Sequence, residues 1–319
     1  MHWLGACLSI LLALAPRGAI AQEWPSKPVK IIVPYPPAGA ADTVARVVAD
    51  KLSKALGQSF IVENKPGAAG IIGLELAARS APDGYTLAVL PDIVSSAPHI
   101  YKLTFDPVKD LVPVVQLTQQ PIVLSAHPSL GVATLAELTA LAKAKPGLGF
   151  ATSGIGTGQH MLGAWFAKLA GIELNHIPYK GGGQAITDHV AGQVPLASLG
   201  SSPLLPHHAA GNLRLLAQST KGRAPTLKTV PTFQELGFTD ILLVQWFGLV
   251  VPAGTPLAIV ERLNLETNTL LRDADTLERL EKGALEAVGG TTADFAKLVV
   301  RDFEKYGRLF KELNIKVEQ

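Results

Sequence analysis

Residues Ile31–Gly57 read IIVPYPPAGAADTVARVVADKLSKALG. The apolar run Val29–Val33 predicts a strand that ends at Pro34. A loop of proline, glycine and alanine follows, and apolar residues then recur at helical spacing up to Gly57. Such a loop delivers the chain to a helix N-terminus, whose first N–H groups have no intrahelical partner and favour an anion. We expect a carboxylate or phosphate cradle here, and an ordinary strand–helix turn capped by Asp42 explains the pattern equally well.

The composition indicates a folded protein of two domains. The chain has 319 residues, of which 48% are hydrophobic and 17% charged, which is enough apolar surface for two cores. The formal net charge of +2, without a basic run interleaved with aromatics, gives no reason to expect a nucleic-acid partner.

The N-terminal segment predicts export. Residues Leu4–Ala15 form an apolar run too short to span a bilayer, and an A-x-A cleavage pattern follows at Ala19-Ile20-Ala21. We therefore interpret residues 1–21 as a signal peptide and the protein as periplasmic. Cys7 is the only cysteine, so the exported chain would have no thiol for catalysis, a disulfide or a metal site.

Alternating strand and helix patterns predict two α/β units. The chain crosses between them near residues 116–125 and again near 242–248. The first lobe would consist of residues 22–123 plus 245–319, the second of 124–244, and the cleft between them is a natural ligand site. We expect strands at 60–63, 85–90, 111–116, 122–126, 148–152, 173–177, 196–199, 213–218 and 244–251, and helices at 67–81, 135–144, from 157, 184–190, 204–210, from 255 and from 291.

Two further glycine-rich loops precede predicted helices. Residues Thr152–His160 read TSGIGTGQH, which predicts a second backbone cradle with the hydroxyls of Ser153 and Thr157 as extra donors. The third loop, YKGGG at 179–183, carries Lys180, which could neutralise an anionic ligand but would more commonly be a solvated surface lysine.

Nucleotide, metal and hydrolytic patterns are weak in this sequence. The glycines at 67, 70 and 73 have the wrong spacing for a dinucleotide fingerprint and favour close helix packing. The pair His207-His208 has no third ligand at suitable spacing, so we expect no metal site and no cofactor. A hydrolase using Ser153 and His160 stays an alternative, although no orienting acid is evident.

The chain strongly resembles the Bug receptors, the TctC-like substrate-binding proteins of tripartite tricarboxylate transporters. The motifs that carry the resemblance are WPSKP at 24–28, PYPPAG at 34–39 with Asp42 following, ENKPGA at 63–68, APDGYTL at 81–87, DPVKD at 106–110, PYKGG at 178–182, WFG at 246–248 and PAGTP at 252–256.

The resemblance implies a type II periplasmic-binding-protein fold, or Venus flytrap, with two α/β lobes joined by two crossing strands. It also implies a binding protein and no enzyme, which clamps a small carboxylate and presents it to membrane permease subunits. In such receptors the loops matching Tyr35–Asp42, Pro91–Ser96 and Ser153–Thr157 line one cleft. The expected ligand-binding residues are Tyr35, Pro37, Ala38, Gly39, Ala40, Ala41, Asp42, Asp92, Ser95, Ser153, Gly154, Gly156, Thr157, His160, Tyr179, Ser201 and Ser202.

Two departures from the family pattern affect the expected ligand. Ala38 stands where the family usually has glycine, and its methyl group should narrow the cradle. Many relatives carry an acidic or amide residue where this chain reads Leu199-Gly200-Ser201, so an ammonium-bearing ligand would lack a charge partner. We therefore expect a dicarboxylate or aromatic carboxylate and a monomeric receptor; a ligand sensor for a two-component system is the alternative.

Overall fold

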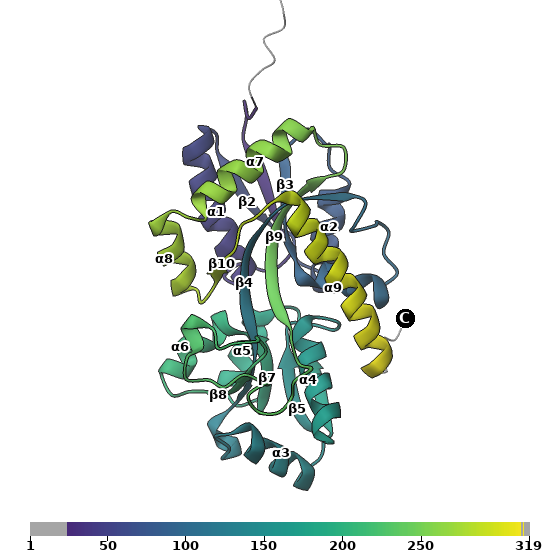
Figure 1. Ribbon diagram of the computed structural model, residues 1–319, viewed down its shortest axis with the longest axis vertical. Helices are drawn as coiled ribbons and strands as arrows, with labels where there is room; N and C mark the ends of the chain where they lie inside the picture. The colour runs from purple at the N-terminus through teal and green to yellow at the C-terminus, as the bar shows by residue number, and fades with distance from the viewer. Residues whose placement is uncertain (1–23, 314, 316–319) are drawn as a thin grey trace, which may run out of the picture.

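The computed structural model describes residues 24–313 and 315, and shows two α/β lobes stacked along the long axis of the molecule (Figure 1). The predicted signal peptide lies outside the described residues. The predicted type II periplasmic-binding-protein fold is confirmed: two α/β lobes are joined by two crossing strands.

The first lobe is built on parallel strands that the sequence predicts well. Strand β1 (Val29–Val33) pairs in parallel with β2 (Phe60–Asn64) on one side and β3 (Thr86–Pro91) on the other. Because both faces of this sheet are covered by helices, β3 reads as a nearly continuous apolar run, TLAVLP, whereas the edge strand β2 ends in polar residues. The covering helices are α1 (Ala40–Leu56), α2 (Ile71–Ala78), α7 (Leu257–Leu270) and α8 (Ala274–Lys282).

The second lobe repeats this plan. Strand β5 (Leu148–Thr152) lies between β6 (Leu174–Pro178) and β7 (Leu196–Gly200), parallel to both. The remaining strand is β8 (Arg214–Gln218), and the helices are α3 (Leu135–Ala144), α4 (Gly158–Ala170), α5 (Gly182–Val190) and α6 (Ser201–Ala209). Helix α3 begins where predicted because Thr134 and Glu137 form a capping box.

Two long antiparallel strands join the lobes. Strand β4 (Leu111–Ala126) pairs with β9 (Val244–Pro252) and β10 (Glu286–Ala287) in the first lobe, and with β7 and β8 in the second. The prediction of two strands at 111–116 and 122–126 was wrong, because both segments belong to the single strand β4. Its pairing with β9 shifts register after Pro113, and this irregularity lets the strand continue past the proline.

Helix α9 (Thr292–Leu313) runs along both lobes (Figure 1). Its first half contributes Phe295 and Val299 to a core of the first lobe, and its second half contributes Tyr306 and Phe310 to the core of the second. The helix therefore packs across the junction that the crossing strands span. The short 3₁₀ helices are at Ala68–Gly70, Asp92–Ser95, Ala97–His99, Pro128–Leu130 and Pro225–Leu227.

Three local predictions differ from the structure. The segment predicted as one helix over 67–81 begins as a 3₁₀ turn, because Ala69 has a left-handed φ of 53°. The helix predicted from residue 255 begins at Leu257, because Pro256 occupies the N-cap and the Thr255 hydroxyl donates to the Pro252 carbonyl. Helix α8 was not predicted, although Asp273 caps it.

The close-packing interpretation of the glycines is confirmed at Gly73, where a Cβ would lie 2.7 Å from the Lys65 carbonyl oxygen.

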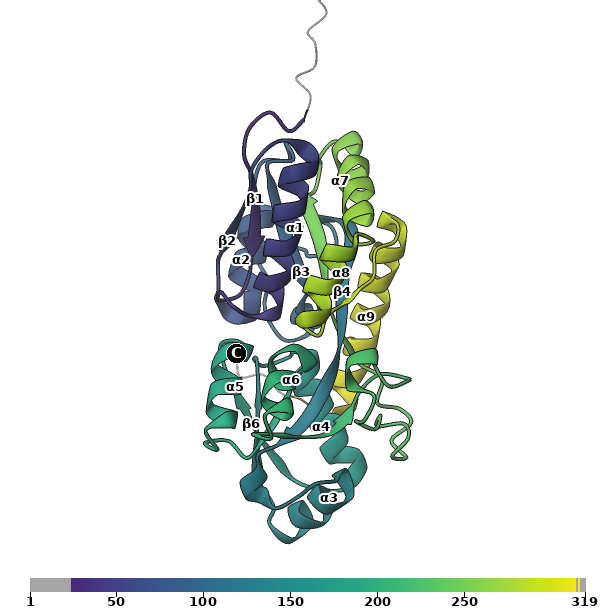
Figure 2. The same ribbon diagram turned by 90° about the vertical axis from the view of Figure 1, so that its left-hand side faces the viewer.

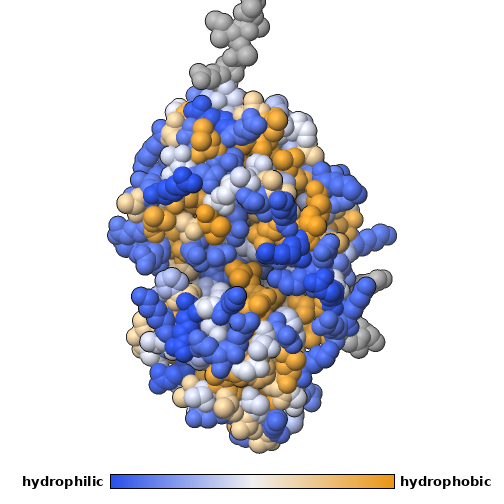
Figure 3. Space-filling model, viewed as in Figure 1, coloured by the Kyte–Doolittle hydropathy of each residue, from blue (hydrophilic) through white to orange (hydrophobic). Residues whose placement is uncertain are grey.

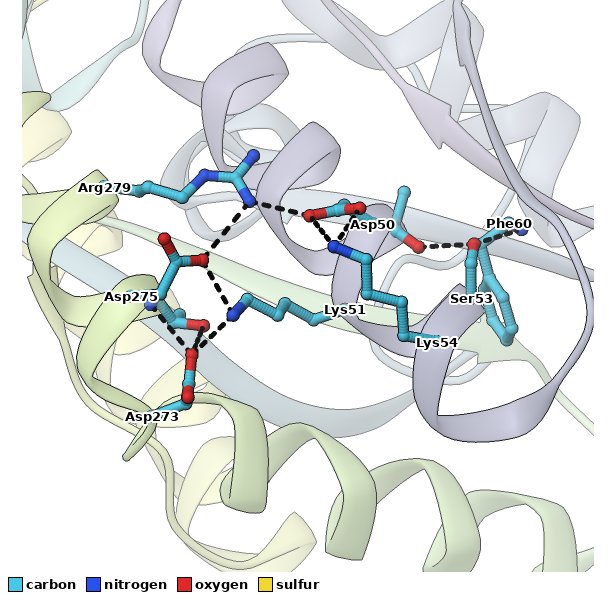
Figure 4. A network of polar contacts seen from close by, with 10 residues as sticks. Asp50, Lys51, Ser53, Lys54, Phe60, Asp273, Asp275 and Arg279 are labelled. Atoms are coloured by element: carbon cyan, nitrogen blue, oxygen red, sulfur yellow. Dashed lines mark hydrogen bonds and ion pairs between the residues drawn. The ribbon is translucent and has the colours of Figure 1, made fainter.

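Helix α8 is held on α1 by a network of charged side chains (Figure 4). Lys51 pairs with Asp273 at 2.5 Å and with Asp275 at 2.7 Å, and Arg279 reaches Asp50 at 2.7 Å. Apart from that of Lys51, these side chains are at least a third exposed, so the contacts position α8 rather than stabilise the lobe strongly.

The face shown in Figure 3 mixes hydrophilic, intermediate and hydrophobic residues on both lobes. Among the described residues, none of the helices combines the length and the apolar character needed to cross a bilayer.

Candidate functional site

A cavity of about 410 Å³ lies between the two lobes. Figure 2 shows α5 and α6 of the second lobe facing the first lobe across the waist of the molecule. The cavity is lined by Tyr35, Pro36, Pro37, Ala38, Gly39, Ala40, Ala41, Thr43, Gln120, Ser153, Gln159, Lys180, Gly181, Gly182, Gly183, Gln184, Ile186, Leu199, Gly200, Ser202, Pro203, Gln245 and Phe247. Its volume is in the range of small-molecule sites.

The first wall is the loop between β1 and α1. Ala38 has a left-handed φ of 68°, and its N–H donates to the Asp42 carboxylate at 3.0 Å. Arg46 and Asn64 donate to the same carboxylate at 2.9 Å each. Burial alone would raise the pKa of Asp42, but these hydrogen bonds hold it below its usual value. Asp42 therefore holds the conformation of the loop through these hydrogen bonds and does not line the cavity.

This arrangement leaves the N-terminus of α1 open to the cavity. Its N-cap residue is Gly39, which offers no side chain as a cap, and Ala40 and Ala41 line the cavity directly. The first N–H groups of a helix have no acceptor within it, and they carry a partial positive charge. The loop therefore presents bare backbone donors, as the sequence pattern predicts.

The opposite wall is the loop that leads into α5. Its N-cap residue, Gly181, has a φ of 143° that favours glycine, and no side chain caps this helix either. A Cβ at Gly181 would lie 3.5 Å from Pro36, so the two loops touch across the cleft. Lys180 also lines the cavity. The structure describes all of the lining residues, and among them only Lys180 has a charged side chain.

The Thr152–His160 loop contributes less to the cavity than its sequence suggests. Ser153 lines the cavity, and its N–H donates to the Gln159 side chain at 2.9 Å. Gly154, Gly156 and Thr157 do not line it. The Thr157 hydroxyl instead caps α4 by accepting from His160 N–H and donates to the Gly154 carbonyl at 2.9 Å.

His160 lies behind this loop, and among the described residues no hydrogen bond joins it to Ser153. Its Nδ1 accepts the Gly156 N–H at 3.2 Å, and its ring stacks on His176 at 3.7 Å. Burial lowers the pKa of His160 to about 4, so the ring is neutral near pH 7.

Asp92 and Ser95 lie at the junction of the lobes but outside the cavity lining. Asp92 is 3% exposed, and its carboxyl is hydrogen-bonded by the Tyr306 hydroxyl of α9. Burial, reinforced by the charge of Asp302, raises the pKa of Asp92 to about 7. The Ser95 hydroxyl donates to the Val299 carbonyl at 3.4 Å, so both residues dock α9.

The floor of the cavity is made by residues from the crossing strands and the N-terminus of α6. The side chains of Gln120 and Gln245 join at 2.8 Å, and Ser202 N–H donates to Gln120 at 2.8 Å. Tyr179 and Ser201 do not line the cavity. The Tyr179 hydroxyl turns to Asp188 at 2.7 Å, and burial together with that carboxylate raises the pKa of Tyr179 to about 12.

Only some of the expected ligand-binding residues therefore line the cavity. Those lining it are Tyr35, Pro37, Ala38, Gly39, Ala40, Ala41, Ser153 and Ser202; those outside the lining are Asp42, Asp92, Ser95, Gly154, Gly156, Thr157, His160, Tyr179 and Ser201. Sequence reasoning missed Gln120 and Gln245, which stand in no motif, and also Gln159 within the TSGIGTGQH loop, and it ranked Lys180 as a surface lysine. The glycine-rich loop before a predicted helix was the available signal for Lys180.

Comparison with known proteins places these features in a family. The model of the family described as tripartite tricarboxylate transporter family receptor matches residues 44–315. Protein BugT of Bordetella pertussis (strain Tohama I) is 34% identical over 327 residues, which cover 100% of this chain and 99% of BugT.

Two solved structures with ligands are similar to this chain. The R. palustris protein Rpa4515 with adipate has a TM-score of 0.89 at 30% identity, covering 92% of this chain and 100% of that one. MatC (Rpa3494) from Rhodopseudomonas palustris with bound malate has a TM-score of 0.82 at 28% identity, covering 89% of this chain and 99% of that one.

Proposed function

The chain belongs to the tripartite tricarboxylate transporter receptor family, whose members are solute-binding proteins and not enzymes, and on this premise we propose that it captures a small dicarboxylate or aromatic carboxylate between its lobes. One carboxylate of the ligand would lie between the N-termini of α1 and α5. The delivery of the ligand to membrane permease subunits is part of the proposal and rests on the family alone.

One observation carries the choice of an anionic ligand. Two helix N-termini without side-chain caps, those after Gly39 and Gly181, face one cavity. Among the lining residues, all within the described part of the chain, there is a lysine and no aspartate or glutamate. A carboxylate gains charge-assisted hydrogen bonds there, whereas a cation would meet only like partial charges. The adipate and malate bound by the two similar proteins support this choice.

Calorimetry with a panel of adipate, malate, glutarate and terephthalate tests the proposal. The decisive variant is Gly182→Glu, because a Cβ at Gly182 meets open space and the new carboxylate would occupy the N-terminus of α5. We expect it to weaken binding of the best ligand by about a hundredfold. The matched control is Gly222→Glu, which adds the same charge at an open position outside the cavity.

The proposal fails if the wild-type protein binds no member of the panel, or if Gly182→Glu binds as tightly as Gly222→Glu. Either result would mean that the paired helix N-termini do not form the carboxylate site.

The lobe assignment and the localisation belong to the same proposal. Residues 22–123 with 245–319 and residues 124–244 would move as two bodies about β4 and β9, closing on the ligand as a monomer. Cleavage after Ala21 would release the chain into the periplasm. N-terminal sequencing of the protein from its host should then begin at Gln22, and a retained Met1 would contradict export.

A further inference from the structure

Two glutamines face each other where the chain crosses between the lobes. Gln120 of β4 and Gln245 of β9 are direct partners in the antiparallel ladder, so their side chains lie on the same face. Both line the cavity, and Gln120 is 1% exposed. A buried amide needs partners for its oxygen and its NH₂ group, and the way these two amides are satisfied determines what they offer a ligand.

The orientation of both amides follows from one backbone donor. Ser202 N–H can only donate, so the Gln120 atom 2.8 Å away must be the carbonyl oxygen Oε1. The other end of Gln120 is then its NH₂ group, which donates to Gln245 Oε1 at 2.8 Å. This bond uses one of the two lone pairs of the Gln245 oxygen and turns its own NH₂ group away from Gln120. Gln245 Nε2 has no acceptor among the residues that the structure describes.

Gly200 makes room for this pair. A Cβ at Gly200 would lie 2.6 Å from Gln120 Nε2 and would also collide with Gln245 Oε1. Its φ of −60° is open to any residue, so the glycine is required by the close approach of the amides and not by its backbone conformation. The glutamine pair and Gly200 therefore form one packed unit between β4, β9 and the start of α6.

Two free amides would offer a ligand both donors and acceptors. At the floor of this cavity the hydrogen bonds within the pair leave mainly a donor. Both amide oxygens already accept within the protein: the Gln120 oxygen accepts from Ser202 N–H and from the Ser201 hydroxyl, and the Gln245 oxygen accepts from Gln120. The remaining group is a donor. An ammonium group, which only donates, would meet this unpaired donor and would find one remaining lone pair, on Gln245 Oε1, whereas a carboxylate or carbonyl oxygen would accept directly from the donor.

We propose that the Gln120–Gln245 pair, oriented by the Ser202 N–H, selects the end of the ligand opposite the helix N-termini: it takes a carboxylate or another acceptor oxygen and rejects an ammonium group. This inference rests on the proposed function and adds to it a specificity-determining residue, Gln245, and a positioning residue, Gln120. The ligand class is a dicarboxylate or oxo-carboxylate rather than an amino acid.

Matched ligand pairs test the selection in the full-length protein. The pairs are succinate with 3-aminopropanoate, glutarate with 4-aminobutanoate and adipate with 6-aminohexanoate, each differing only in the distal group. The readout is the ratio of the two dissociation constants at the chain length that binds best. We expect the wild-type protein to favour the dicarboxylate by about a hundredfold, since an unpaired buried charge costs about 3 kcal/mol.

Gln245→Glu keeps the acceptor for Gln120 and turns a carboxylate oxygen to the cavity. It should lower the ratio by about a hundredfold, by weakening the dicarboxylate and strengthening the amino acid. Gln120→Met removes the group that fixes Gln245, whose oxygen can then face the cavity, but it also frees the Ser202 N–H as a donor, so the ratio should fall by less than in Gln245→Glu. Gln193→Glu, an exposed residue outside the cavity, controls for net charge and should leave the ratio unchanged.

The inference is overturned, and the proposed function survives, if the wild-type protein binds a dicarboxylate but Gln245→Glu and Gln120→Met change the dissociation constants of both members of a pair by the same factor. An equal shift of the ratio in Gln193→Glu would also overturn it, because net charge would then explain the effect. If the wild-type protein binds none of the six compounds, the proposed function fails and this inference with it.

Discussion

Asp92→Asn should make the protein more stable at pH 8, and the gain should disappear toward pH 4. The carboxyl is buried against Tyr306 of α9 and the first residue of α4, where a Cβ on Gly158 would lie 3.0 Å from Asp92 Oδ2. Burial and the charge of Asp302 raise the pKa of Asp92 to about 7. An asparagine keeps an acceptor for the Tyr306 hydroxyl but never carries a charge.

The sign follows from proton binding. Between pH 4 and pH 7 the folded state holds a proton on Asp92 that the unfolded state has lost, so the free energy of unfolding falls as pH rises through this window. A pKa raised from 3.8 to about 7 corresponds to a cost of about 4 kcal/mol for ionisation in the folded state, at 1.36 kcal/mol per tenfold change. Relaxation around the charge lowers this cost, so we expect a gain of about 2–4 kcal/mol at pH 8.

The assay is urea unfolding of both proteins at several values between pH 4 and pH 8.5, with the difference in unfolding free energy plotted against pH. Titrations common to both proteins cancel in the difference. Asp240→Asn, at an exposed position, is the matched control and should give a flat difference near zero. If Asp92→Asn is less stable than wild type at pH 8, Asp92 is a favourably held anion and the reasoning is refuted.

Three other variants or measurements test the loops and the closure. Ala38→Gly should raise the free energy of unfolding by about 0.5–1 kcal/mol in thermal or urea unfolding, because Ala38 has a φ of 68°; an unchanged or lower stability would contradict the strain. Asp42→Ala should lower it by about 1–3 kcal/mol and weaken carboxylate binding in calorimetry, since three donors lose their acceptor, whereas exposed Arg46→Met should cost less than about 1 kcal/mol. Equal losses in the two variants would mean that Asp42 acts only through Arg46. X-ray scattering should show the radius of gyration falling on addition of a bound dicarboxylate, and an unchanged profile at saturation would exclude hinge closure.

Local sequence signals predicted those parts of the fold that depend on neighbouring residues. Helix α3 follows from Thr134 and Glu137, and the strand–loop–helix at the start of the chain follows from apolar spacing and the stop at Gly57. The continuity of β4 could not be read from its sequence, because Pro113 and Pro121 resemble strand ends until the partner strand supplies a register.

The sequence predicted the site residues that lie in loops before helices. It did not predict those that come together only through the pairing of distant strands. Ala40, Ala41 and Ser153 could be named because small residues before a helical pattern indicate exposed N–H groups. Gln120 and Gln245 are separated by 125 positions, and only the pairing of β4 with β9 brings them together. Thr157 lies outside the cavity lining, because a hydroxyl at a helix start can cap its own helix as readily as it can bind a ligand.

The most direct test of a carboxylate held between two helix N-termini is a titration of the ¹⁵N-labelled protein with adipate or the best dicarboxylate of the panel, followed by amide NMR. The N–H groups of Gly39, Ala40, Gly182 and Gly183 should show the largest shifts and should saturate together, because they would donate to the same anion. Saturable binding whose shifts avoid both loops, for example shifts confined to the groove around Phe105 and Val300, would contradict the proposed site.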